Sequence, residues 1–126
     1  MNLSTNFVVA TVAHMYFPPD SAISSAAFAA GTVADKAGWL VAVPGTLNNL
    51  NILLDGAATT DALTLVVYKN NVATTLTATV TLTGTTGFDR THQVPVVAGD
   101  YISLYCSSTG TTVAVNGAAA LQFVPT

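Results

Sequence analysis

Hydrophobic and hydroxyl side chains alternate along residues 62–69 and again along residues 72–83, and Asn70-Asn71 joins the two runs. Asparagine tolerates the positive φ that a primed two-residue turn requires, so this stretch predicts a tight β-hairpin. Closing the hairpin at the two asparagines gives four expected cross-strand pairs: Lys69–Val72, Val67–Thr74, Leu65–Leu76 and Leu63–Ala78.

The two faces of this hairpin differ in chemistry. Aliphatic side chains fall on one face and threonines on the other, with Val66 as an exception. A register slip of one residue would exchange the faces of a strand, so burial of the leucines is expected to hold the register. A lone hairpin is marginal in water, and a second sheet should therefore cover the aliphatic face. That face consists of Leu63, Leu65, Val67, Leu76, Ala78, Val80 and Leu82.

Short alternating runs separated by turn residues continue along the rest of the chain, which is typical of a sandwich or barrel. With the hairpin they predict eight strands, the number found in a double Greek-key jelly roll. We expect an all-β, antiparallel two-sheet jelly-roll sandwich of about eight strands, occupying residues 1–126 as a single domain. Outside the hairpin, strands are expected at 6–17, 38–43, 46–54, 90–97, 101–107 and 112–124, with a loop at 83–87.

The N-terminal strand or arm, residues 1–17, is apolar on both of its faces over residues 6–17. A two-layer sandwich covers only one face of a strand, so this excess predicts contact with a neighbouring subunit. Residues 18–38 show no alternation and are expected to be an irregular or short-helical insertion. Folding back on its own sheet and contact with another subunit both stay open for this insertion. The expected interface residues are Phe7, Met15, Tyr16, Phe17, Ile23 and Phe28.

Charge is scarce along the whole chain. Charged residues make up 7% of it, against about 25% in an average globular protein. Three cations and a net charge of -3 give no basic footprint, so nucleic acid is not an expected partner. No apolar run reaches the roughly 20 residues of a membrane span, and no basic segment marks a secretion signal. An exterior with so little charge favours a chain that functions in a packed assembly.

Several turn and core motifs carry a resemblance to a known module. They are Gly45-Thr46-Leu47-Asn48-Asn49-Leu50, the segment Leu63 to Asn71 with Thr74-Thr75-Leu76, Asp89-Arg90-Thr91-His92, and Val97 to Leu104. Together they resemble a β-sandwich module of tailed-bacteriophage structural proteins, which is broadly similar to tumour-necrosis-factor-like heads and to phage capsid decoration proteins. The resemblance covers residues 39–124. It implies a virion structural protein. Together with the scarce charge and the doubly apolar N-terminal strand, it leads us to expect a homotrimeric decoration or cement protein on the capsid surface, bound to the major capsid protein of the same phage.

Two other functions stay open. One is a receptor-binding or head-fibre tip domain of a phage, and the other is a bacterial extracellular carbohydrate-binding module. A platform of tyrosines for stacking sugars would support either function. The same rings could instead cover strand edges or pack between subunits. The tyrosines concerned are Tyr16, Tyr68, Tyr101 and Tyr105.

Two histidines, His14 and His92, are the obvious candidates for acid–base chemistry. Both lie on expected strands, where a structural or surface role is more common than catalysis. The cluster Asp89-Arg90-Thr91-His92 places an acid near a base, yet neighbours along a strand point to opposite faces. We therefore expect Asp89 or Arg90 to bind loop backbone, and we expect no enzymatic activity.

Metal and thiol chemistry find little support. Asp55 and Asp61 flank a short polar loop that could hold Ca²⁺, but their spacing matches no established calcium loop. The single cysteine, Cys106, excludes an internal disulfide and alternates inward with Leu104, so it is expected in the core. No cofactor or metal is expected.

Overall fold

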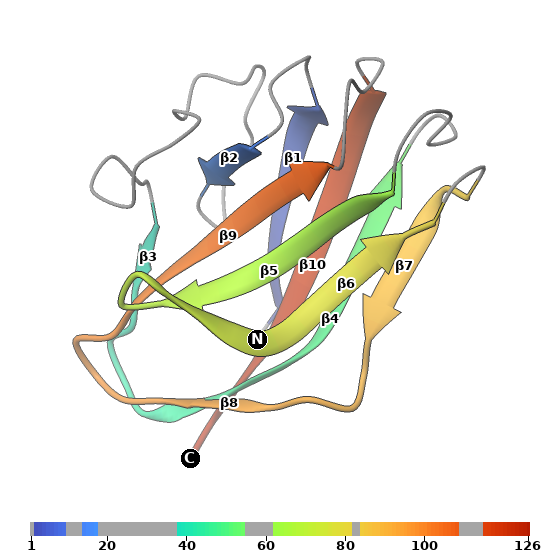
Figure 1. Cartoon of the computed structure of the whole chain (residues 1–126). Helices are drawn as coiled ribbons and strands as arrows, with labels where there is room; N and C mark the ends of the chain where they lie inside the picture. Colours follow the sequence, from blue (N-terminus) through green and yellow to red (C-terminus); the bar gives the residue numbers. More distant parts are fainter. Residues whose placement is uncertain (1, 10–13, 18–37, 55–61, 82–83, 109–114) are drawn as a thin grey trace.

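The computed structural model describes residues 2–9, 14–17, 38–54, 62–81, 84–108 and 115–126, and these ranges form ten strands in two antiparallel five-stranded sheets (Figure 1). Sheet A has the order β1 (Asn2–Val9), β10 (Val115–Pro125), β4 (Gly45–Leu54) and β7 (Thr86–Asp89), and β8 (Val94–Val96) also pairs with β4. Sheet B has the order β2 (His14–Phe17), β9 (Tyr101–Ser108), β5 (Leu63–Lys69) and β6 (Val72–Val80), and β3 (Trp39–Leu40) also pairs with β9.

The strand order is that of a jelly roll. Setting aside the short strands β3 and β8, eight strands remain, and the first pairs with the last, the second with the seventh, the third with the sixth and the fourth with the fifth. Such nested pairs arise when one long antiparallel ribbon rolls up into two layers. Figure 1 shows β9, β5 and β6 in front and the paler β1 and β10 behind. The all-β, two-sheet antiparallel sandwich expected from the sequence is confirmed.

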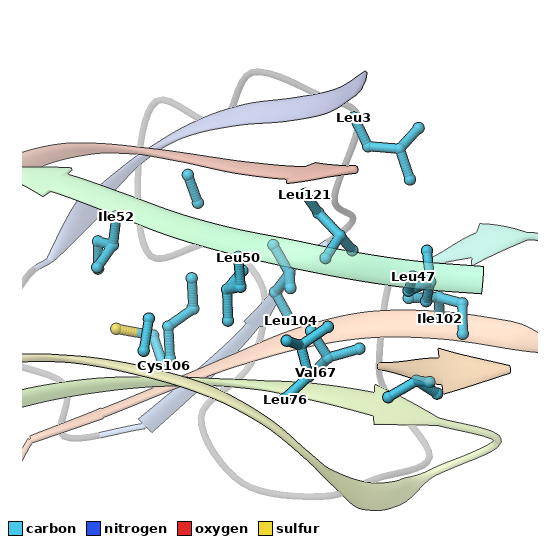
Figure 2. Packing of buried hydrophobic residues seen from close by; sticks show 14 of the residues in the cluster. Leu3, Leu47, Leu50, Ile52, Val67, Leu76, Ile102, Leu104, Cys106 and Leu121 are labelled. Carbon is cyan, nitrogen blue, oxygen red and sulfur yellow. The ribbon is translucent and has the colours of Figure 1, made fainter. Parts of the chain in front are cut away.

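The core lies between the two sheets and is filled by the inward faces of both. Leu47, Leu50 and Ile52 of β4 are buried from one side (Figure 2). From the other side, the described residues of the predicted aliphatic face of the hairpin are buried, as their alternation predicted: Leu63, Leu65, Val67, Leu76, Ala78 and Val80. At one end the ring of Trp39 meets that of Phe123 edge to face, with centroids 5.3 Å apart.

The central hairpin turns where the sequence places it. Asn70 and Asn71 have φ values of 50° and 70°, which gives the primed turn, and Lys69 pairs with Val72 as expected. Beyond the turn the expected register is wrong. Leu65 lies opposite Ala78 and Leu63 opposite Val80, so β6 has slipped by two residues.

A bulge in β6 at Thr74 accounts for the slip. The Thr74 hydroxyl donates to the carbonyl of Val67 over 2.7 Å and accepts from the amide of Leu76 at 3.3 Å. At the bulge, three residues of β6 lie opposite Val67 alone, so the regular backbone hydrogen bonds of the ladder are interrupted. The Thr74 side chain supplies hydrogen bonds in their place. A shift of two residues keeps every side chain on its face, so the buried and exposed sets are as expected although the partners differ.

The single N-terminal strand expected over residues 6–17 is wrong. The chain forms β1 and β2 instead, and these belong to different sheets. Residues 2–9 and 14–17 therefore belong to different layers, so the apolar residues at 6–17 do not form one strand and no longer indicate a neighbouring subunit by that argument. Most of the insertion expected at 18–38 lies outside the described residues and stays a prediction.

Three other expected boundaries differ. The strand expected at 38–43 is reduced to β3, and the strand expected at 90–97 to β8. The expected loop at 83–87 instead leads into β7. A Cβ at Gly87 of β7 would collide with the carbonyl oxygen of Thr79 in β6, so the glycine permits the close approach of two strands and does not mark a loop.

Candidate functional site

One end of the sandwich gathers the β5–β6 turn, the loops around β3 and β8, and the C-terminus, at the lower left of Figure 1. We call this the turn end and define it by residues 40–44, 70–72, 97–100 and 124–126. Backbone hydrogen bonds join its segments: Val41 N to Asp100 O, Gly99 N to Val41 O, Asn70 N to Tyr101 O and Thr126 N to Pro44 O. Loops from four parts of the sequence are therefore held together at this end.

Asp100 is the polar centre of the turn end and is buried. Its carboxylate accepts from the backbone amide of Val97 at 2.9 Å and from the side-chain amide of Asn70 at 2.7 Å. The Lys69 ammonium lies 3.5 Å away and donates to the carbonyl of Pro95. The hydrogen bonds from Val97 and Asn70, together with the positive charge of Lys69, hold the pKa of Asp100 below its usual value.

Around this centre the surface is aliphatic. Five of the seven large hydrophobic side chains that are exposed among the described residues lie at the turn end, each 42–66% exposed. They come from segments that the backbone hydrogen bonds above hold together, so they share one end of the molecule. Exposed apolar groups that gather in this way are typical of protein contact surfaces. The five are Leu40, Val43, Val72, Val97 and Val124.

Asp89 joins the two sheets at the edge of the sandwich where β7 lies beside β6. It belongs to β7 of sheet A, and its Oδ2 accepts from the backbone amide of Thr77 in β6 at 3.1 Å. Its Oδ1 accepts from the backbone amides of Thr91 and His92 at 3.0 and 3.1 Å. The expectation that Asp89 binds loop backbone is confirmed.

The environment of Asp89 keeps its carboxylate ionised. Burial alone raises the pKa of Asp89, but hydrogen bonds from Thr77, Thr91 and His92 outweigh it and hold the pKa far below its ordinary value. His92 also places Nδ1 2.7 Å from Asp89 Oδ2. The expectation that these two residues point apart is wrong, because the chain bends after β7 and His92 is not on a strand. The Thr91 hydroxyl adds a fifth hydrogen bond to the carboxylate at 3.1 Å, so the contact with His92 is part of a saturated structural cluster.

A second exposed surface lies on the outer face of sheet A, across β7, β4 and β10. The pairing places Thr86 beside Leu53 and Ala118 in one cross-strand row, and Phe88 beside Asn51 and Ala120 in the next. Phe88 and Leu53 are 59% and 55% exposed. Small alanines next to large side chains leave a hollow of about 540 Å³, which also reaches Arg90.

A row of polar side chains continues from this hollow. The guanidinium of Arg90 lies 4.2 Å from the centre of the Phe88 ring and donates to Asn51 Oδ1 at 3.3 Å. Asn51 in turn donates to the carbonyl of Asn49, and Asn49 donates to Gln122 Oε1 at 2.6 Å. Three of these residues line a second hollow of about 280 Å³ that shares Asn51 and Ala120 with the first.

A β-bulge in β4 makes this row possible. Asn49 has a φ of 50°, and Asn49 and Leu50 together lie opposite Leu121 of β10. The extra residue redirects the Asn49 side chain toward Gln122. Sequence reasoning missed the surface, because the positive φ at Asn49 and the pairing of β7 with β4 follow from tertiary contacts. The one available signal was a large aromatic residue, Phe88, directly after the loop expected at 83–87.

The expected interface residues are placed only in part. Phe7 lies in β1 opposite Gly117, and residues 15–17 lie in β2 opposite residues 104–106. Nothing is described of these side chains, and Ile23 and Phe28 lie outside the described residues. The six residues thus stay a prediction.

The expected tyrosine platform is partly assembled. Tyr68 and Tyr105 lie on the outer face of sheet B with ring centroids 5.4 Å apart. Tyr16 lies opposite Tyr105 in the register, and Tyr101 is half-buried. Two of the four rings thus meet on the outer face of sheet B, and the role of the tyrosines stays a prediction.

The remaining chemical candidates give no reactive centre in the described parts of the chain. Cys106 is buried in the core as expected, and burial raises the pKa of its thiol to about 12. Asp55 and Asp61 lie outside the described residues, and elsewhere no three metal-binding side chains come together. In the same ranges no helix has the length and apolarity needed to cross a membrane.

Comparison with known proteins extends the description of the fold. No protein-family model matches the chain, and no curated protein sequence matches it. Among solved structures, the chain is similar to a chain of the acid-stable capsid of Helicobacter pylori bacteriophage KHP30, with a TM-score of 0.50 and 10% identity. The match covers 100% of this chain and 95% of that one. The likeness is therefore one of fold over the whole length, and it is to a chain from a phage capsid structure.

Proposed function

We propose that this chain is a phage virion structural protein that decorates and stabilises a capsid by adhesion. The observation that carries the proposal is the group of five exposed aliphatic side chains at the turn end of a sandwich that has few charges. Burying apolar surface at this end would yield about 25 cal/mol per Å² before the costs of association. The likeness in fold to a chain of a phage capsid supports the same role.

The finer form of the proposal is a homotrimeric cement protein on the capsid surface, bound to the major capsid protein. The rigid turn end supports it, because hydrogen bonds at Asp100 fix the loops that carry the aliphatic groups and less entropy is lost on docking. The six interface residues expected in residues 1–28 would form the contacts between subunits. The receptor-binding tip and the carbohydrate-binding module are the alternatives.

The test combines mass in solution with binding to empty capsids of the phage that encodes the chain. Light scattering should give three times the 12.8 kDa of one chain, and the protein should co-sediment with capsids. Val97→Asp would place a charge on the turn end and should weaken co-sedimentation at least tenfold. Thr75→Asp, an exposed position on the outer face of β6, is the matched control and should bind normally. A monomer that fails to bind capsids would overturn the proposal.

A further inference from the structure

We propose that the hollow on the outer face of sheet A binds a saccharide that carries a carboxylate group. The site spans β7, β4 and β10, apart from the aliphatic turn end, so the inference does not rest on the proposed capsid role. Its volume of about 540 Å³ falls within the roughly 300 to 1,000 Å³ typical of small-ligand sites.

The apolar part of the hollow suits the C–H face of a sugar ring. The small side chains of Ala118 and Ala120 form the bottom of the hollow. Leu53 and Phe88 form its sides, and each is more than half exposed. An exposed aromatic ring offers a flat apolar surface that keeps little conformational freedom. The Arg90 guanidinium lies over one face of the Phe88 ring, so the ring edge and its other face are the surfaces that it offers to a sugar.

The polar row supplies partners for hydroxyl groups. The Asn49 side-chain amide donates to Oε1 of Gln122. The side-chain NH₂ group of Gln122 therefore points away from this bond and can donate to a ligand. The side-chain oxygen of Asn49, Oδ1, stays available as an acceptor, whereas its backbone carbonyl accepts from Asn51. Hydroxyls both donate and accept, so a row presenting both functions at fixed positions suits a polyol better than an apolar peptide side chain. The second hollow of about 280 Å³ lies along this row.

Charge selects the kind of saccharide. Among the described residues that line the hollow, Arg90 is the one ionised side chain. Only its Nη2 is engaged, by Asn51, which leaves further N–H donors for a carboxylate. Asp89, next in sequence, turns its carboxylate toward Thr77 and His92 and so does not compete for the guanidinium. A single cation is too little for a polyphosphate or nucleic acid.

The experiment measures binding to the full chain by calorimetry and by amide chemical shifts. The probes are 3′-sialyllactose and trigalacturonic acid, which carry carboxylates, with lactose as the neutral reference. At least one acidic probe should bind tenfold or more tightly than lactose and shift the amides of Asn51, Ala120 and Gln122. The shift map in the unmodified chain tests the site even where a variant fails to fold.

Two variants and a control complete the test. Arg90→Gln should abolish the preference for the acidic probe, and Phe88→Ala should weaken binding of that probe at least tenfold. Val72→Ala, at the turn end, should bind as the unmodified chain does. No binding at millimolar concentration, a preference for lactose, or affinities that neither variant alters would overturn the inference. So would loss of capsid binding or a changed mass in solution on Phe88→Ala, because the face would then be a protein contact.

Discussion

The side-chain amide of Asn70 donates a hydrogen bond of 2.7 Å to the carboxylate of Asp100, and this bond joins two turns that lie 30 residues apart. The other end of the same amide, Oδ1, accepts from the backbone amide of Tyr101 at 2.8 Å. Asn70 therefore has two tasks: it adopts the positive φ of the hairpin turn, and it fixes that turn against the β8–β9 loop.

Replacing Asn70 by Asp should destabilise the fold. The variant keeps the acceptor for Tyr101 but places a second carboxylate against Asp100 where an amino group donated before. Like charges at this distance repel, so the urea midpoint at about pH 7 should fall. Gln93→Glu makes the same change of amide to carboxylate at an exposed residue and should leave the midpoint nearly unchanged.

Replacing Asn71 by Gly should leave the free energy of unfolding equal or slightly raised. Asn71 has a φ of 70°, a conformation that glycine adopts without a Cβ penalty. Asn71→Ala keeps the Cβ without a polar side chain and should cost about 1 to 2 kcal/mol. Thermal unfolding of the three proteins measures this order, and a loss above about 1 kcal/mol for Asn71→Gly would contradict it.

Replacing Thr74 by Val should weaken the hairpin by about 1 to 3 kcal/mol, because two backbone groups at the bulge would lose their partner. Thr74→Ser keeps the hydroxyl and should retain most of the stability. Urea unfolding distinguishes the two, and hydrogen exchange at Leu76 should accelerate only in the valine variant. Equal stability of both variants would mean that the hydroxyl does not hold the bulge.

The stability should depend on pH through Asp89. Its folded pKa lies far below the usual value of about 4, so the folded state binds a proton less readily than the unfolded state. Its contribution is therefore complete above about pH 4 and is lost as the pH falls through the folded pKa. Unfolding in urea between about pH 7 and pH 2.5 should show this decline.

Asp89→Asn should be less stable than the unmodified chain near neutral pH, by about 1 to 3 kcal/mol, and its stability should fall less steeply in acid. Asp100 also has a lowered pKa, so a smaller dependence on pH should persist in the variant. Parallel curves for the two proteins would show that Asp89 does not contribute to acid sensitivity.

The alternation of aliphatic and hydroxyl residues by itself determined the fold class, the buried faces of β5, β6 and β9, and the position of the hairpin turn. These follow from local properties: a strand has a period of two, and Asn70-Asn71 accepts positive φ. The same alternation places Cys106 in the core. The small number of charged residues leaves the exterior with little charge.

Tertiary structure decided what alternation cannot encode. A shift of two residues preserves both faces, so only the Thr74 bulge selects Leu65 opposite Ala78. The strand β7 pairs with β4 and approaches Thr79 of β6 at Gly87, and the division of residues 6–17 between two sheets likewise depends on partners distant in sequence. The aliphatic turn end and the hollow beside Phe88 likewise combine segments that only the rolled ribbon brings together. Periodicity fixes which side of a strand faces the core, whereas the choice of neighbour is made by contacts between distant segments.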